Sequence, residues 1–151
     1  MTGQMRILTK RLREGPAIFR RLNRKLLQVG GESLVIHPCS NNEIAEMVFC
    51  YGGSLSQTVA RKKKMTSNDC HRNTAKLWRA GKLDAICLGY GLSKDGLWRE
   101  HYWGMKDDHI VETTISRTAY FGATFRGEAG DIIVGIWKAK GRALLPPAKV
   151  G

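Results

Sequence analysis

The chain has 151 residues, of which 42% are hydrophobic and 25% are charged. These proportions are typical of a globular protein and exclude a collagen, a coiled coil and a disordered chain. A chain of this length folds as one domain with its own core, so we expect a single domain over residues 1–151 with loose ends at 1–14 and 141–151. No apolar run reaches the roughly 18 residues that span a bilayer, and residues 1–13 lack the apolar core of a signal peptide. We therefore expect a cytoplasmic protein that binds no membrane.

Basic residues outnumber acidic residues by 25 to 13, which gives a formal net charge of +12. Most of the excess lies in residues 6–25 and in the run 61–64. Such an excess is typical of proteins that bind nucleic acid or an acidic protein, although a solvated face and a solvated loop are the ordinary explanation. Phe19 is the one aromatic residue near the basic runs, so base-stacking platforms are missing. Nucleic acid is therefore the weaker alternative among the partners.

The first half of the chain is predicted to be helical. Apolar residues recur at helical spacing over residues 16–29 with basic residues between them, which predicts an amphipathic helix. The capping-box pattern from Ser40 to Glu43 predicts a second helix over residues 41–50. Capping residues before Cys70 and a stop at Gly81 predict a third helix over residues 69–80. Residues 51–68 are predicted to be a long connection.

The second half is predicted to be a sheet. Residues 84–92 are almost continuously apolar, residues 97–105 follow an Asp-Gly turn, and residues 110–115 follow a second turn. This pattern predicts antiparallel strands joined by tight turns. Residues 131–137 are predicted to add a fourth strand. Because the helices precede the strands, the chain is predicted to be α+β, with N-terminal helices packed on an antiparallel sheet.

The cysteines are Cys39, Cys50, Cys70 and Cys87, and in a chain without a secretion signal they are predicted to be free thiols. Cys70 falls in the first turn of the third predicted helix. Backbone N–H groups and the positive end of a helix stabilise a thiolate there, and they lower a cysteine pKa from about 8.5 toward roughly 3.5–7.5. Cys70 is therefore a candidate nucleophile. The alternative is a small buried residue, which is the usual state of an unpaired cysteine.

A thiolate nucleophile needs a base, and His101 in the middle of the second predicted strand is the candidate. The period of two places His101 and Trp103 on one face, where the indole would exclude water and orient the imidazole. Glu112 on the next strand is the candidate acceptor for the second ring nitrogen. Asp107 and Asp108 in the turn are alternatives, because the pattern does not fix the register. A histidine packed among aromatic residues and a solvated Glu112 are the structural alternatives.

These residues, in this order, resemble the papain and transglutaminase-like superfamily of thiol enzymes. The matching stretches are Cys70-His71-Arg72-Asn73, His101-Tyr102-Trp103 and Val111-Glu112-Thr113-Thr114, followed by Ala119-Tyr120-Phe121-Gly122, and they cover about residues 67–122. The resemblance implies a papain-like fold and acyl transfer on amides. It implies that Cys70 is the nucleophile, His101 the general base and then acid, and Glu112 the orienting group. Glu112 departs from the family pattern, in which Asp or Asn is more frequent.

Two further features concern the surroundings of Cys70. Asn68 or Gln57 is a candidate side-chain donor to an oxyanion, beside the backbone N–H of Cys70. A clear upstream glutamine motif is missing. His37 and the cysteines do not have the spacing that sets two metal ligands on one turn. We therefore expect no metal and no cofactor.

The sequence thus predicts a small cysteine-dependent amidohydrolase or acyltransferase of the protease, glutamine deamidase or transglutaminase type. Its substrate is expected to be a protein or peptide, and an acidic one is compatible with the positive net charge. Two alternatives remain open. One is a basic module that binds nucleic acid or an acidic protein, and the other is an inactive papain-like relative.

Overall fold

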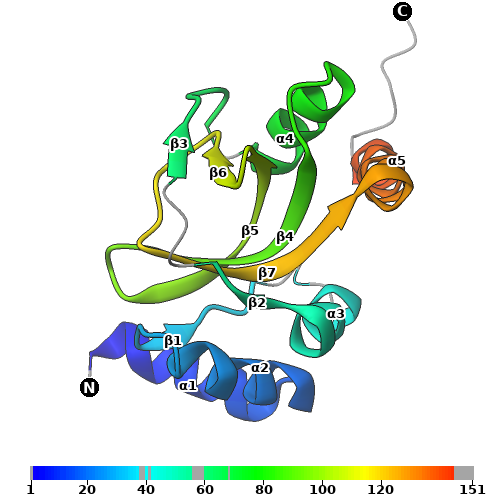
Figure 1. Cartoon of the computed structure of the whole chain (residues 1–151). Helices are drawn as coiled ribbons and strands as arrows, with labels where there is room; N and C mark the ends of the chain where they lie inside the picture. The colour runs from blue at the N-terminus through cyan, green and yellow to red at the C-terminus, as the bar shows by residue number, and fades with distance from the viewer. Residues whose placement is uncertain (1, 38–39, 41, 56–59, 68, 145–151) are drawn as a thin grey trace, which may run out of the picture.

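The computed structural model describes residues 2–37, 40, 42–55, 60–67 and 69–144, which form five helices and a seven-stranded sheet (Figure 1). The helices are α1 (Gly3–Glu14), α2 (Ala17–Leu27), α3 (Asn42–Tyr51), α4 (Cys70–Arg79) and α5 (Gly127–Leu144). The strands are β1 (Ser33–Leu34), β2 (Gly53–Ser54), β3 (Ala60–Lys62), β4 (Ala85–Leu92), β5 (Leu97–Lys106), β6 (His109–Glu112) and β7 (Ala119–Arg126).

The sheet is mixed and mostly antiparallel. Its strands follow the order β2-β7-β4-β5-β6-β3, and β1 pairs with β5 beside this path. Pairing is antiparallel from β2 through β6, whereas β1 runs parallel to β5 and β3 runs parallel to β6. The predicted α+β class with N-terminal helices is therefore confirmed. The sheet differs from the prediction because two of its short strands are parallel to their neighbours.

The central strands arise where the sequence predicts them. All eight residues of β4 are buried, because β5 and β7 flank it and packed elements cover it. The predictions for residues 84–92 and 97–105 match β4 and β5 to within one residue. The third strand is shorter than predicted, because β6 ends at Glu112 rather than at residue 115.

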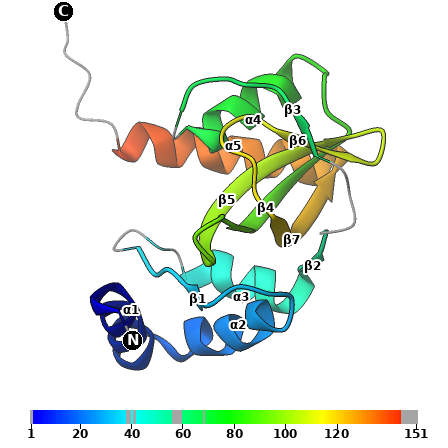
Figure 2. The same ribbon diagram turned by 90° about the vertical axis from the view of Figure 1, so that its left-hand side faces the viewer.

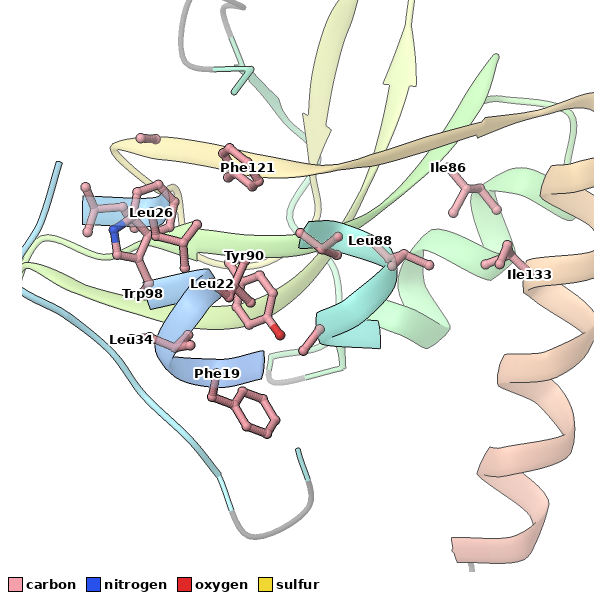
Figure 3. Packing of buried hydrophobic residues seen from close by; sticks show 14 of the residues in the cluster. Phe19, Leu22, Leu26, Leu34, Ile86, Leu88, Tyr90, Trp98, Phe121 and Ile133 are labelled. Carbon is pink, nitrogen blue, oxygen red and sulfur yellow. The ribbon is translucent and has the colours of Figure 1, made fainter. Parts of the chain in front are cut away.

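The helices cover the sheet from two ends of the molecule. In Figures 1 and 2, α1, α2 and α3 lie at one end, and α4 and α5 lie at the other. The predicted helices over residues 16–29, 41–50 and 69–80 are confirmed as α2, α3 and α4. Leu22 and Leu26 of α2 are fully buried and pack with Tyr90, Trp98 and Phe121 of the sheet (Figure 3). The amphipathic pattern of α2 therefore sets how the first helices attach to the sheet.

The turn after α2 brings the chain to the edge of β5. Trp98 donates its indole N–H to the carbonyl of Gly30 over 2.8 Å. Gly31 has a φ of +80°, and a Cβ there would lie 2.9 Å from Trp98 Nε1. Glycine is therefore required at Gly31 for its conformation and for the close approach. The N–H of Val35 then donates to the carbonyl of Trp98 over 2.8 Å, which places the chain after β1 beside the first residues of β5.

The expectation of a loose N-terminal end is wrong, because Gly3–Glu14 forms α1. The hydroxyl of Thr2 accepts a hydrogen bond from the N–H of Met5 over 3.2 Å and caps the helix. Leu8 and Leu12 are buried on its inner face. At the other end, α5 continues to Leu144, so the first part of the predicted loose segment 141–151 is helical. Residues 145–151 lie outside the described residues.

The predicted fourth strand over residues 131–137 is also wrong, because this segment lies within α5. Ile133, Val134 and Trp137 are buried, whereas Ile132 and Ile136 are 57% and 45% exposed. This burial follows the helical spacing rather than the period of two. A run of β-branched residues favours a strand locally, but packing against the sheet decides the outcome.

Strands also occur in segments for which the sequence predicts none. The strand that completes the central sheet is β7, which pairs with β4 along its full length. The predicted connection 51–68 contains β2 and β3, one at each end of the strand order. Within the described residues, no helix has both the length and the apolar character needed to cross a membrane.

Candidate active site

A cavity of about 430 Å³ opens beside the middle of β5. On this edge of β5, β1 pairs at Leu97 and Trp98, and β6 pairs from Gly104 to Lys106. Among the described strands, none pairs with this edge between the two regions. The beginning of α4 packs there. The cavity is lined by Val35, His37, Ser40, Cys70, Arg99, Glu100, His101, Thr114, Ile115 and Arg117.

Cys70 is the first residue of α4, as predicted, and its free thiol is partly buried at this cavity. Burial raises the pKa of the thiol to about 11, although the backbone N–H of Tyr102, the charge of Arg117 and the N–H of His71 act to lower it. The charge of Glu112 acts in the same direction as burial. The prediction that a helix start would lower this pKa is therefore not met, because desolvation outweighs the favourable dipoles. At neutral pH the thiol needs a proton acceptor before it can act as a nucleophile.

His101 lies in β5 and lines the same cavity as Cys70. Its side chain is 1% exposed and stacks on Trp103, with ring centroids 5.9 Å apart and planes inclined by 26°. The predicted placement of both rings on one face of the strand is confirmed. Tyr120 of β7 also lies beside the imidazole, with ring centroids 6.3 Å apart, and its ring contacts Trp103 edge-on with centroids 5.0 Å apart. These ring contacts restrict the orientation of the imidazole.

Glu112 is the carboxylate that binds His101. The Nε2 atom of His101 lies 2.7 Å from Oε1 and 3.0 Å from Oε2 of Glu112, whose side chain is fully buried. The solvated Glu112 that the sequence left open is thereby excluded. The alternative partners, Asp107 and Asp108, lie in the turn between β5 and β6 and have φ values of +50° and +62°.

The hairpin register explains why a glutamate fits this position. The two-residue turn pairs Lys106 with His109 and Gly104 with Val111. Continuing this register places Glu112 beside Trp103, so it lies diagonally from His101 on the same face. Diagonal Cβ atoms in a sheet are about 7–8 Å apart. The additional methylene of glutamate, compared with aspartate, helps to span this separation.

Three further donors hold the Glu112 carboxylate. The Tyr120 hydroxyl donates to Oε1 over 2.8 Å. The backbone N–H and the hydroxyl of Thr114 donate to Oε2 over 3.2 Å and 3.3 Å. Burial alone would raise the pKa of Glu112, but His101, Tyr120 and Thr114 together hold it below its ordinary value. The carboxylate is therefore ionised at neutral pH, which favours a proton on Nε2 of His101 and leaves Nδ1 as an acceptor.

Glycines make room for the rings on this face of the sheet. Gly89 of β4 pairs with both His101 and Gly122. A Cβ on Gly122 would lie 2.7 Å from Cη2 of Trp103 and 2.6 Å from the carbonyl oxygen of Leu88. The indole can therefore lie close to the sheet only because Gly122 has no side chain.

Two arginines at the cavity have different partners. Arg99 forms a bidentate ion pair with Asp95, with distances of 3.1 Å and 2.8 Å. Arg117 donates from Nη1 to the hydroxyl of Ser93 over 2.8 Å, and its stem lies over Gly91. The Nε atom of Arg117 is buried, and no acceptor lies within hydrogen-bond distance of it among the described residues. The positive charge of Arg117 therefore acts on the cavity with less compensation than that of Arg99.

Several of these groups were not predicted from the sequence. Thr114 follows Glu112 by two residues, so its N–H and hydroxyl reach the carboxylate without any long-range pairing. Tyr120 and Arg117 reach the site through the pairing of β7 with β4, which no local pattern shows. The predicted oxyanion donors Asn68 and Gln57 lie outside the described residues, as does Cys39.

Comparisons with protein-family models, with curated proteins and with solved structures found no match to this chain. In the part of the chain that the structure describes, no group of three or more His, Cys, Asp or Glu side chains is arranged to hold a metal ion. Cys50, Cys70 and Cys87 are free thiols.

Proposed function

We propose that the protein is a thiol amidohydrolase or acyltransferase of the papain and transglutaminase-like type, with Cys70, His101 and Glu112 as its triad. One observation carries the proposal. Glu112 binds Nε2 of His101 with both carboxylate oxygens, while the imidazole lines the same cavity as the thiol of Cys70. This arrangement orients the imidazole and leaves Nδ1 to exchange a proton with the thiol.

The proposed reaction begins with transfer of the Cys70 proton to Nδ1 of His101. The thiolate adds to the carbonyl carbon of an amide, which forms a C–S bond and places negative charge on the oxygen. The imidazolium then gives its proton to the leaving nitrogen as the C–N bond breaks, and a thioester remains on Cys70. Water or an amine, deprotonated by His101, adds to the thioester and releases the thiol.

The electrostatics of the site act on these steps in both directions. The ionised Glu112 stabilises the imidazolium that forms when His101 accepts the proton. The charge of Arg117 and the N–H groups of Tyr102 and His71 lower the pKa of Cys70. Desolvation outweighs them, and the pKa of the Cys70 thiol is raised to about 11. The thiolate is therefore expected to form as an ion pair with His101 rather than as a free anion.

Iodoacetamide alkylation followed by peptide-resolved mass spectrometry tests the proposal, with two other cysteines as internal controls. Cys50 is exposed and Cys87 is buried. At about pH 6 an ordinary thiol with a pKa near 8.5 is less than about 1% ionised. We expect Cys70 to react faster than Cys50 at this pH, and Cys87 to react only after unfolding. His101→Gln should remove the advantage of Cys70 and leave the rate of Cys50 unchanged.

The main readout of a second measurement uses the wild-type chain. The wild-type chain, incubated with a p-nitrophenyl ester, should release p-nitrophenol in a burst and carry one acyl group on the Cys70 peptide. Cys70→Ser should abolish the burst. If Cys70 reacts more slowly than Cys50 at pH 6 and no acyl group accumulates on it, the proposed function is wrong.

A further inference from the structure

A second concave surface, distinct from the cavity at Cys70, lies between β3, β6 and the end of α4. Its volume is about 200 Å³. In both views of the molecule these elements lie together at the end opposite α1 and α2 (Figures 1 and 2). We call it the basic groove, and it is lined by Arg61, Lys62, Lys63, Leu77, Lys82, Leu83, Lys106 and Val111.

The cations of the basic groove come from three separate elements. Arg61 and Lys62 belong to β3, Lys82 follows α4, and Lys106 ends β5. Lysines on an edge strand commonly prevent aggregation, but this role needs cations on β3 alone. The convergence of Lys82 and Lys106 on the same groove therefore calls for a different explanation.

Backbone structure fixes two of these lysines next to each other. The N–H of Lys63 donates to the carbonyl of Glu112 over 2.7 Å, which holds Lys63 against β6. The N–H of Lys82 donates to the carbonyl of Leu77 over 3.0 Å, and Gly81 has a φ of +71°. This glycine-terminated helix end turns the chain back over α4. The two ammonium groups lie close enough that Lys82 lowers the pKa of Lys63.

Acidic partners are few at this surface. Lys106 forms an ion pair with Asp84 over 3.2 Å. Within the described residues, no ion pair involves Arg61, Lys62, Lys63 or Lys82. Neighbouring like charges repel, and an anion placed between them would relieve this repulsion.

The apolar residues of the basic groove and the open edge of β3 indicate which class of anion the groove would bind. Leu77, Leu83 and Val111 form an apolar cluster beneath the cations, each with a little exposed surface. The lining has no aromatic ring on which a base could stack. β3 is the last strand in the sheet order, so its outer edge carries no further strand among those described. An open strand edge accepts an extended peptide through backbone hydrogen bonds.

We propose that the basic groove binds an extended acidic peptide, which adds to the edge of β3, sets its carboxylates against Lys63 and Lys82, and places apolar side chains on Leu83. The acidic peptide is favoured over nucleic acid because the groove combines cations with an apolar floor and a free strand edge. The proposal does not depend on chemistry at Cys70. It therefore stands or fails separately from the proposed function, and Cys70→Ser should bind the peptide as the wild type does.

The probe is a fluorescein-labelled peptide of alternating glutamate and valine, and its binding to the full chain is followed by fluorescence anisotropy. The matched control peptide has glutamine in place of glutamate. The double variant Lys63→Glu/Lys82→Glu removes the groove charge. Its control, Lys10→Glu/Arg11→Glu, makes the same change in net charge at two exposed residues of α1. Lys63→Gln/Lys82→Gln serves as a milder variant if the charge reversal affects folding.

Each rim charge pair that is lost should weaken binding several-fold, so we expect the groove variant to lose roughly tenfold or more in affinity and the α1 variant less than about threefold. The glutamine peptide should also bind roughly tenfold more weakly. An equal loss of affinity in both double variants would overturn the proposal, because the net charge of the protein would then explain the binding without the groove. Equal binding of the two peptides, or full displacement of the acidic peptide by an oligothymidylate of the same charge at equal concentration, would also overturn it.

Discussion

The Nε2 atom of His101 lies 2.7 Å and 3.0 Å from the two carboxylate oxygens of Glu112, and the two side chains are 1% and 0% exposed. A buried pair of this kind contributes little when it is compared with two apolar residues, but it is costly to break. Removal of one partner leaves the buried polar atoms of the other without their hydrogen bonds. The pair is therefore expected to influence stability as well as reactivity.

Glu112→Gln should lower the free energy of unfolding at pH 7 by about 3 kcal/mol, because it removes the ionised member of a buried pair. Urea denaturation measures this difference. Glu46→Gln, at an exposed glutamate of α3, is the matched control and should change the free energy by less than about 0.5 kcal/mol.

The effect of Glu112→Gln on the free energy of unfolding should depend on pH, in a direction that follows from the pKa of Glu112. Its neighbours hold this pKa below the ordinary value of 4.5. A carboxyl group with a depressed pKa stabilises the folded state fully above its unfolded pKa, and this contribution is lost as the pH falls through the folded pKa. The difference in stability between wild type and Glu112→Gln should therefore shrink below pH 4.5. A difference that stays constant between pH 7 and pH 3 would contradict this assignment.

Arg117 provides a second prediction, for the reactivity of Cys70. Its charge lowers the pKa of the thiol, so Arg117→Gln should raise that pKa and slow the alkylation of Cys70. We expect a decrease of less than about tenfold at fixed pH, which corresponds to less than one pKa unit. Arg99→Gln is the matched control, because Arg99 lines the same cavity but is neutralised by Asp95. Equal effects of the two substitutions on the alkylation rate would show that the net charge of the protein, rather than the position of Arg117, controls the pKa of the Cys70 thiol.

The parts of the site that were predicted correctly depend on short-range signals. Capping residues and a glycine stop bound α4, which put Cys70 at its first position. The period of two along β5 put His101 and Trp103 on one face. The register that brings Glu112 to His101 was left open, although the two-residue turn at Asp107 and Asp108 determines it. Both residues adopt positive φ, which aspartate tolerates better than most side chains.

The parts that were missed depend on long-range packing. Tyr120 reaches Glu112 because β7 pairs with β4 over their whole length, and no sequence pattern gives that pairing. The thiol pKa was predicted in the wrong direction for a similar reason. A helix start lowers the pKa of an exposed cysteine, but the amount of desolvation at Cys70 follows from how α4 packs on β5.

The failure at residues 131–137 has a specific physical cause. Three β-branched residues in a row suggested a strand, but the helix α5 buries Val134 and Trp137 on one face. Gly130 allows this face to approach α4, where the indole N–H of Trp78 donates to Asp131 over 2.8 Å. Local propensity was therefore overridden by a contact between two helices that are far apart in the sequence.

The contact between α4 and α5 gives a third prediction. A Cβ on Gly130 would lie 2.6 Å from Cη2 of Trp78, whereas Gly135 of the same helix has no atom within 4 Å of such a Cβ. Gly130→Ala should lower stability by about 1–3 kcal/mol because the indole must move. Gly135→Ala should raise it by up to about 1 kcal/mol, because alanine favours a helix over glycine. Thermal melts of both variants measure the contrast, and a stabilised Gly130→Ala would disprove the close packing.

A fourth prediction concerns the space beneath Trp103. Gly122 and Gly53 are partners in the register of β7 and β2, yet a Cβ on Gly122 would lie 2.6 Å from the carbonyl oxygen of Leu88 and one on Gly53 would meet nothing within 4 Å. Gly122→Ala should therefore lower the free energy of unfolding by about 1–3 kcal/mol, because the backbone of β4 cannot yield as a flexible side chain does. Gly53→Ala should change it by less than about 0.5 kcal/mol.

The same substitution distinguishes packing from catalysis at this face of the sheet. A Cβ on Gly122 would also press on Trp103, which stacks on His101. If the indole fixes the imidazole, Gly122→Ala should slow the alkylation of Cys70 at pH 6 even in the fully folded fraction, and Gly53→Ala should leave it unchanged. A destabilised Gly122→Ala with wild-type alkylation of its folded fraction would mean that Trp103 supports the core without orienting His101.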